Sequence, residues 1–158
     1  MASTEYAGGY EPGAYILQLQ KASSGAIARG VVVDLNTSTN VWRTAPTTGS
    51  SAKYGVCTKT AADGELVVDV CLKGVVYLTA DGVIEPGRKV QVSGTTAGQI
   101  VQYADATVGG TYAEAEVEAA GLNFARIVGT YLGHVDENDG KYPPTVTADG
   151  DIARVLLE

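Results

Sequence analysis

The chain has 158 residues, of which 45% are hydrophobic and 18% are charged, and its formal net charge is −7. The apolar content excludes a wholly disordered chain, and the length suits one domain that buries about 70% of the surface of its unfolded chain. The acidic balance argues against DNA or an anionic membrane as the partner, because no basic stripe is present to neutralise phosphates.

Residues 1–14 are rich in Gly, Ala and Tyr and show no hydrophobic period, which predicts a flexible N-terminal arm. Large amphipathic rings are unusual in an inert linker, where Ser and Gly are preferred. We therefore expect the arm to be a docking peptide, with a disordered tail as the alternative. Its candidate binding residues are Tyr6, Tyr10, Pro12 and Tyr15.

Short apolar runs separated by polar turns predict a succession of strands after the arm. In the first part of the chain they are expected at residues 15–19, 31–35, 41–44 and 54–60. The stretch 53–103 continues this pattern with Asp-Gly and Pro-Gly turns, which favour tight reversals of the chain. Later strands are expected at residues 65–72, 89–92, 99–103, 124–135 and 152–157.

Alternation of hydrophobic and polar residues is clearest between residues 65 and 72. The side chains expected on the buried face are those of Leu66, Val68, Val70 and Leu72. Gly74 interrupts the β run that follows, which predicts a bulge or bend where one strand leaves a sheet to close a barrel.

These elements predict an all-β fold, a small β-barrel or β-tulip-like domain with short hairpins, an extended N-terminal arm and at most one short helix. We expect residues 1–14 to be the flexible docking arm and residues 15–158 to form a single β-barrel domain. Within it, residues 104–122 are predicted to be an exposed acidic insertion, either a helix or an ordered loop. Residues 136–147 are predicted to be a polar loop.

The two cysteines, Cys57 and Cys71, flank the turn at residues 61–64. A hairpin around this turn places Cys57 opposite Val68 or Asp69, with Cys71 about two positions further along. That diagonal separates the Cα atoms by roughly 7–8 Å, which exceeds the usual disulfide range of about 4.4–6.8 Å. We expect free thiols used as small core residues.

Candidate reactive residues are few. His134 is the single histidine and lacks an orienting carboxylate, so we expect a surface histidine at a strand end. Residues 136–140 are mainly acidic, but an EF-hand needs Gly at position 6 and Glu at position 12, where Lys141 and Thr147 stand. No nucleophile-elbow or phosphate-loop motif occurs. The sequence predicts a protein that is not an enzyme and has no metal and no cofactor.

The order of scaffold segments resembles that of a known family, and it spans about residues 24–103 and 124–157. The segments that carry it are Ser24-Gly25, Gly30-Val31-Val32-Val33, Tyr54-Gly55-Val56, Leu66–Leu78, Glu85–Val92, Gly98–Val101, Ala125–Gly129 and Ala153–Leu157. Together they are similar to the capsid cement (head decoration) proteins of tailed viruses, which are small β-barrel proteins of the lambda-type decoration kind. The Tyr-rich arm and residues 104–122 and 136–147 depart from the shorter members.

The resemblance implies a protein that binds the outer surface of an assembled icosahedral capsid and bridges neighbouring major capsid protein subunits. It further implies a homotrimer, synthesised in the host cytoplasm and located on the virion, with the major capsid protein and itself as partners. Because no secretory signal or roughly 20-residue apolar span is present, we expect a soluble protein. The alternative is a carbohydrate- or cell-surface-binding β module, which would need Trp42, Tyr77 and Tyr131 to cluster outside the core.

Overall fold

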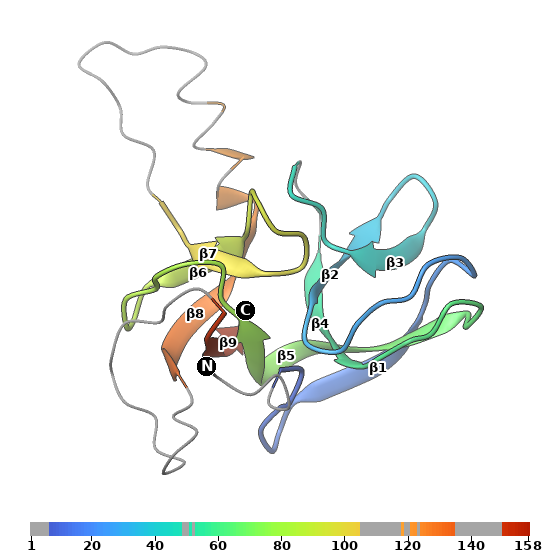
Figure 1. The fold of residues 1–158 in the computed structure, drawn as a ribbon, viewed down its shortest axis with the longest axis horizontal. Coiled ribbons are helices and arrows are strands. Elements are labelled where there is room, and N and C mark those ends of the chain that lie inside the picture. The colour runs from blue at the N-terminus through green and yellow to red at the C-terminus, as the bar shows by residue number, and fades with distance from the viewer. Residues whose placement is uncertain are drawn as a thin grey trace.

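The computed structural model describes residues 7–48, 51, 53–104, 118, 121–122, 124–134 and 150–158. In these ranges nine strands form one curled antiparallel sheet, so the predicted all-β class is confirmed (Figure 1). The strands are β1 (Tyr15–Gln20), β2 (Val32–Asn36), β3 (Val41–Thr44), β4 (Tyr54–Lys59), β5 (Val67–Thr79), β6 (Lys89–Val92), β7 (Ile100–Gln102), β8 (Ile127–His134) and β9 (Ile152–Leu157). Neighbours follow the order β3-β2-β4-β5-β9-β8-β6-β7, and β1 pairs with β5.

Strand β5 belongs to both halves of the sheet. Up to Lys73 it pairs with β1 and β4, and from Gly74 onward it pairs with β9. Gly74 has a φ of 113°, which a residue with a Cβ avoids. The predicted bend at Gly74 is confirmed, and it lets one strand run from the β1–β4 half into the β6–β9 half (Figure 1).

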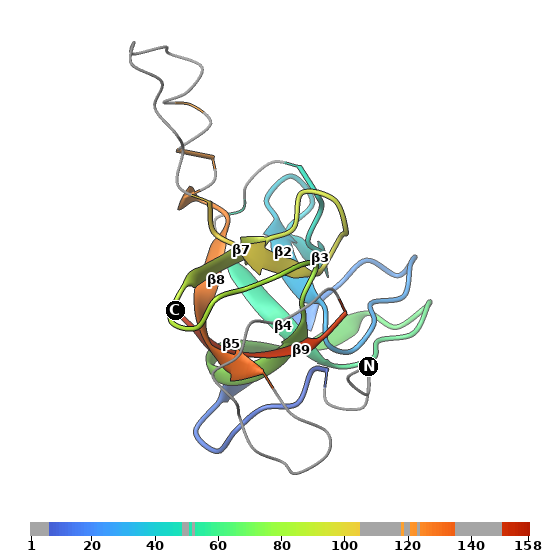
Figure 2. The ribbon, with the colours of Figure 1, turned by 60° about the vertical axis from the view of Figure 1, so that its left-hand side comes forward.

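Each half of the sheet is curled (Figure 2), and an isolated bridge joins its outer strands. Lys21, directly after β1, bridges to Trp42 in β3, and Ala80, directly after β5, bridges to Ile100 in β7. The sheet therefore has the shape of a half-barrel, with inward side chains that form two cores. The first core contains the buried residues Ile27, Val33, Trp42, Cys57, Ala61, Val68 and Val70. The second is larger and includes Val76, Leu78, Ile84, Val90, Ile100, Tyr131 and Val155.

The predicted burial pattern around residue 70 is partly confirmed. Val68 and Val70 are buried and Leu72 packs against the same core. Leu66, however, is 62% exposed, because β5 begins one residue later and Leu66 belongs to the preceding loop.

Both cysteines are buried free thiols, as the sequence predicts. The predicted register is wrong by one or two positions, because Cys57 pairs with Val70 and Cys71 pairs with Val56. An irregularity between Cys57 and Lys59 shifts the pairing. Most of the predicted insertion at residues 104–122 and all of the predicted loop at residues 136–147 lie outside the described residues.

Candidate docking site

The N-terminal segment, residues 7–14, lies along the edge of the second half of β5. Tyr10 forms an antiparallel bridge with Val76. The backbone hydrogen bonds of this pairing run from Gly8 N–H to the Tyr77 oxygen (2.8 Å), from Tyr77 N–H to the Gly9 oxygen (3.0 Å) and from Glu11 N–H to the Val75 oxygen (3.0 Å). The segment therefore extends the sheet beyond β5, in line with β1.

This arrangement differs from the flexible arm that the sequence predicts. The physical reason is that the segment's peptide groups find partners on β5, and Ala7 is buried against Ile152 and Tyr77. Backbone pairing of this kind has no signature in a sequence rich in Gly and Ala. Residues 1–6, which include the candidate Tyr6, lie outside the described part of the chain.

Two glycines, Gly8 and Gly30, let the start of the segment pack closely against the chain before β2, and we call this contact the Gly8–Gly30 seat. Gly8 and Gly30 both have positive φ, 76° and 84°. A Cβ on Gly30 would lie 2.5 Å from the Cβ of Ala7, and a Cβ on Gly8 would lie 2.7 Å from the Gly30 nitrogen. Because real Cβ atoms do not approach other heavy atoms so closely, the two backbones pack against each other only when both residues are glycine.

The Glu11 side chain binds the other end of the segment to β9 and β5. The Arg154 guanidinium in β9 donates two hydrogen bonds to the Glu11 carboxylate, one of them from Nη2 to Oε2 at 2.8 Å. The Tyr77 hydroxyl donates a third, at 3.2 Å. The hydrogen bond from Arg154 is the main cause of the lowered pKa of Glu11, and desolvation opposes it. We call this group the Glu11 clasp. No sequence pattern reveals it, because Glu11 and Arg154 are 143 residues apart.

The last four residues of the segment, 11–14, form a turn before β1. The Ala14 N–H donates to the Glu11 oxygen (3.2 Å), Pro12 stands at the second position and Gly13 has a φ of 91°, which matches a type II turn. From Tyr10 to Tyr15 the chain advances five positions, whereas β5 advances only three between the paired residues Val76 and Lys73. The two extra residues bulge outward.

The described candidate residues lie on the outside of this edge. Tyr10 is 52% exposed and Tyr15 is 55% exposed, and Pro12 between them is exposed as well. The bonds flanking Tyr10 come from its neighbours, so its own N–H and C=O point away from β5. Among the described strands β1 pairs only with β5. We call residues 7–20 the outer edge, because they present backbone groups and two exposed rings together.

The aromatic residues of the alternative hypothesis do not gather on the surface. Trp42 is 8% exposed and Tyr131 is 0% exposed, and the two belong to different cores. Tyr77 is half-buried and packs against the Ala7 and Ile152 pair. These rings therefore form no common platform for a sugar.

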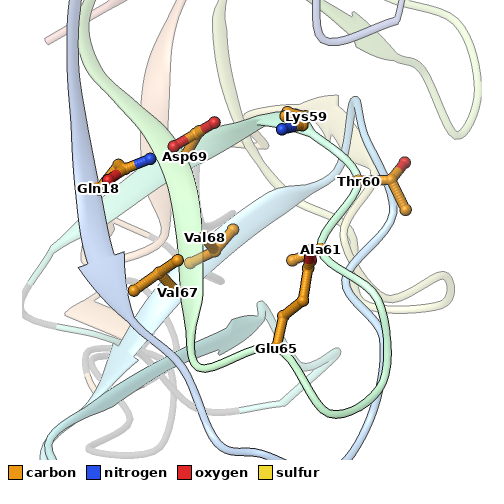
Figure 3. A pocket seen from close by; sticks show the side chains of 8 residues that line it. All are labelled: Gln18, Lys59, Thr60, Ala61, Glu65, Val67, Val68 and Asp69. Carbon is orange, nitrogen blue, oxygen red and sulfur yellow. The ribbon is translucent and has the colours of Figure 1, made fainter.

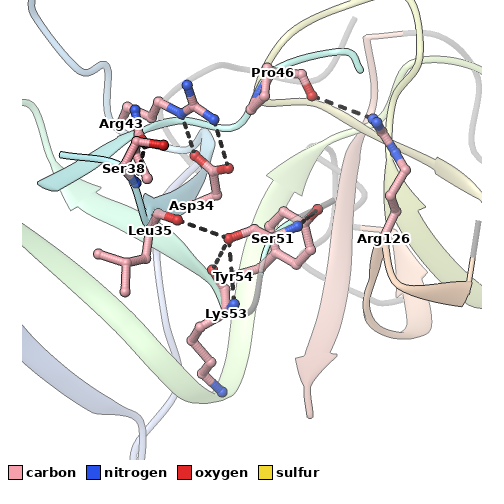
Figure 4. A network of polar contacts seen from close by, with 10 residues as sticks. Asp34, Leu35, Ser38, Arg43, Pro46, Ser51, Lys53, Tyr54 and Arg126 are labelled. Carbon is pink, nitrogen blue, oxygen red and sulfur yellow. Dashed lines mark hydrogen bonds and ion pairs between the residues drawn. The ribbon is translucent and has the colours of Figure 1, made fainter. Parts of the chain in front are cut away.

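Two recesses among the described residues are candidate ligand sites. The first, between β1, the end of β4 and the start of β5, has a volume of about 50 Å³ (Figure 3), well below the roughly 300–1,000 Å³ of ligand pockets. The second, of about 510 Å³, lies beside β2 and β3. Its two charged side chains, Asp34 and Arg43, already pair with each other at 3.0 Å (Figure 4).

Within the described residues no group of three or more His, Cys, Asp or Glu side chains could hold a metal ion. His134 is the last residue of β8, at a strand end as predicted. No helix in the described ranges is both long and apolar enough to cross a membrane. Comparison with known proteins gives no family model, no curated protein and no solved structure that matches the chain.

Proposed function

We propose that the chain is a capsid decoration (cement) protein, which binds the outer surface of a mature icosahedral head and bridges neighbouring major capsid protein subunits. The observation that carries the proposal is the outer edge, where Tyr10 and Tyr15 are exposed on a segment held by the Glu11 clasp. The sequence resemblance to decoration proteins supports it independently. The function needs a surface for protein contact, which the outer edge offers.

The physical basis is strand addition at an open edge. An extended segment of a capsid subunit that pairs with the outer edge gains backbone hydrogen bonds, while pockets that receive the tyrosine rings give specificity. Tyrosine is among the residues that most often dominate interface energies. A homotrimer would present three such edges, so a modest affinity at each site gives strong overall binding.

The edge is pre-organised, and this supports a docking role more strongly than a free tail would. Ordering a flexible segment on binding costs conformational entropy, which reduces affinity. Here residues 7–14 are already fixed by backbone hydrogen bonds and by the Gly8–Gly30 seat. The binding energy is therefore not reduced by ordering this part of the chain.

The test measures binding to purified empty shells of the major capsid protein of the virus that encodes this chain under the proposal, both expanded and unexpanded. We expect saturable binding to expanded shells only. The variant Tyr10→Ser/Tyr15→Ser should bind at least about tenfold more weakly, since truncating one hot-spot tyrosine costs about 2 kcal/mol or more and ~1.4 kcal/mol is a factor of ten. Phe124→Ser is the matched control, because Phe124 is an exposed aromatic residue outside the outer edge, at 69% exposure.

Equal binding by the double tyrosine variant and the wild type would contradict the outer edge as the docking site. Absence of wild-type binding to either kind of shell would contradict the function itself. Glycan-array binding together with absence of shell binding would favour the carbohydrate-binding alternative.

A further inference from the structure

We propose that residues 7–11 exchange between copies of this chain, so that the segment of one copy occupies the edge of β5 in another. The occupant is a second copy because the seat is shaped for this segment. This inference does not depend on capsid binding, and it assigns the N-terminal segment a role in self-assembly.

The surface that receives the segment binds it through three separate features. Gly30 admits Ala7 and Gly8 at a distance that no larger residue would allow. The edge of β5 supplies complementary backbone groups at Val75 and Tyr77. Arg154 binds the Glu11 carboxylate through two hydrogen bonds. A second copy carries the same groups, so exchange preserves every one of these contacts, which is the condition for strand exchange at low cost.

The turn at residues 11–14 has the properties of a hinge. Its single internal backbone hydrogen bond is the one of 3.2 Å from Ala14 to Glu11. Pro12 and Gly13 are exposed, and a Cβ on Gly13 would meet nothing within 4 Å. Opening the turn therefore breaks one backbone hydrogen bond, at a point where Pro12 and Gly13 are exposed.

The chain has a defined conformation on each side of the hinge. Ala14 lies directly over Gly74, where a Cβ would come within 2.8 Å of the Ala14 Cα. Proline disfavours helical angles in Glu11 and keeps the chain before it extended. The segment can therefore swing out as a preformed strand while β1 stays in place. The two extra residues of the turn supply the chain length for this movement.

In the closed form the segment pairs with β5 of its own chain. This form and the exchanged form differ mainly in the conformation of the turn and in the entropy of association. Exchange releases the positive φ that Gly13 adopts in the turn. Its cost falls as the local concentration of copies rises, as in any bimolecular step that becomes effectively intramolecular. The exchanged form is thus expected wherever copies are concentrated.

A charge-swap mixing experiment tests the proposal. In Glu11→Arg and in Arg154→Glu alone, the closed segment faces a like charge. When the two variants are mixed, exchange places the arginine introduced at position 11 of one chain beside the glutamate introduced at position 154 of the other. In the reciprocal contact the native Glu11 meets the native Arg154. The double variant Glu11→Arg/Arg154→Glu restores the pair within one chain. It is the reference, because Arg154 and Tyr77 have interactions beyond the Glu11 clasp.

We expect the equimolar mixture to form hetero-oligomers in native mass spectrometry and to melt about 2–4 °C above either variant alone, which corresponds to about 1 kcal/mol for a chain of this size. A mixture that melts as the sum of its components, with no hetero-oligomer, would overturn the proposal. Deleting Pro12 and Gly13 from both variants removes the extra length and should abolish the gain.

A second measurement covers the case in which a charge-swap variant fails to fold. Glu11→Cys chains are mixed with Arg154→Cys chains and treated with a short bis-maleimide. The native thiols of Cys57 and Cys71 are buried and do not compete. Exchange predicts covalent heterodimers that vanish when Pro12 and Gly13 are deleted, and their absence in the full-length mixture would overturn the proposal.

Discussion

Replacement of Gly30 by alanine tests the seat of the N-terminal segment. The new Cβ would lie 2.5 Å from the Cβ of Ala7 and 2.8 Å from its carbonyl carbon. The second contact is with backbone, so a change of rotamer cannot relieve it. Either the seat deforms or residues 7–11 move away from β5.

The expected cost is the sum of two terms. Holding alanine at a φ of 84° costs about 1–2 kcal/mol, because left-handed angles bring Cβ too close to the following carbonyl oxygen. Overpacking against Ala7 adds about 1–3 kcal/mol. Detachment of the segment would relieve the overpacking, but it would lose three backbone hydrogen bonds of about 0.5–1.5 kcal/mol each, together with the Glu11 clasp and the burial of Ala7.

The variant Gly25→Ala measures the first of these two terms alone. Gly25 has nearly the same φ, 82°, but a Cβ there meets nothing within 4 Å. Urea unfolding of both variants should show Gly30→Ala to be less stable than Gly25→Ala by about 1–3 kcal/mol. Hydrogen exchange locates the damage, because the Tyr77 amide donates to the Gly9 oxygen. In Gly30→Ala this amide should exchange about 10–100 times faster, since each ~1.4 kcal/mol is a factor of ten.

The reasoning is refuted if the two alanine variants are equally stable and the Tyr77 amide keeps its protection in Gly30→Ala. That result would mean that the close approach of Gly30 and Ala7 does not hold the segment. A second check is Ala7→Gly in the Gly30→Ala background, which removes the nearest contact and should recover part of the lost stability.

Two further predictions concern titration. The pKa of Asp81 is lowered, first by the hydrogen bond from Ser93 and then by that from Thr95. Its stabilising effect is therefore complete above the ordinary pKa of 3.8 and is lost as the pH falls through the native value. Asp81→Asn should lower the free energy of unfolding, measured with urea at pH 7, by about 1–2 kcal/mol. This difference from the wild type should narrow by about pH 2, and a difference that stays constant would contradict the role of Asp81. Burial raises the pKa of Cys57 to about 11 and also raises that of Cys71, so neither thiol should react with a disulfide reagent at pH 8 until urea unfolds the protein; labelling of the native protein would contradict it.

Sequence patterning predicts the strands where side-chain alternation and turn chemistry agree. The ranges 41–44, 89–92 and 152–157 coincide with β3, β6 and β9, because each is a short segment of apolar or alternating side chains between turn residues. The errors lie where the backbone is irregular. Leu66 is exposed and the Cys57 register shifts, since the loop after β4 is longer than a tight hairpin and its pairing has a bulge.

The site is less predictable than the scaffold. The exposed rings of Tyr10 and Tyr15 follow from composition, because large rings in a Gly-rich segment have little core to enter. The fixed position of that segment cannot be predicted from composition. It depends on Gly30 and Arg154, which approach only after β2 and β9 are in place, and neither residue has a local pattern that marks it as a partner of the N-terminus.

The place of β9 in the sheet has a consequence for the order of folding. β9 pairs with β5 on one side and with β8 on the other, so the last of the described strands lies in the interior of the sheet. Proteins are synthesised from the N-terminus at about 5–20 residues per second. Until residues 152–157 have left the ribosome, the second half of β5 lacks its main partner, and Arg154 is absent for Glu11. The nascent chain therefore remains exposed to chaperones and to misassembly until synthesis reaches β9.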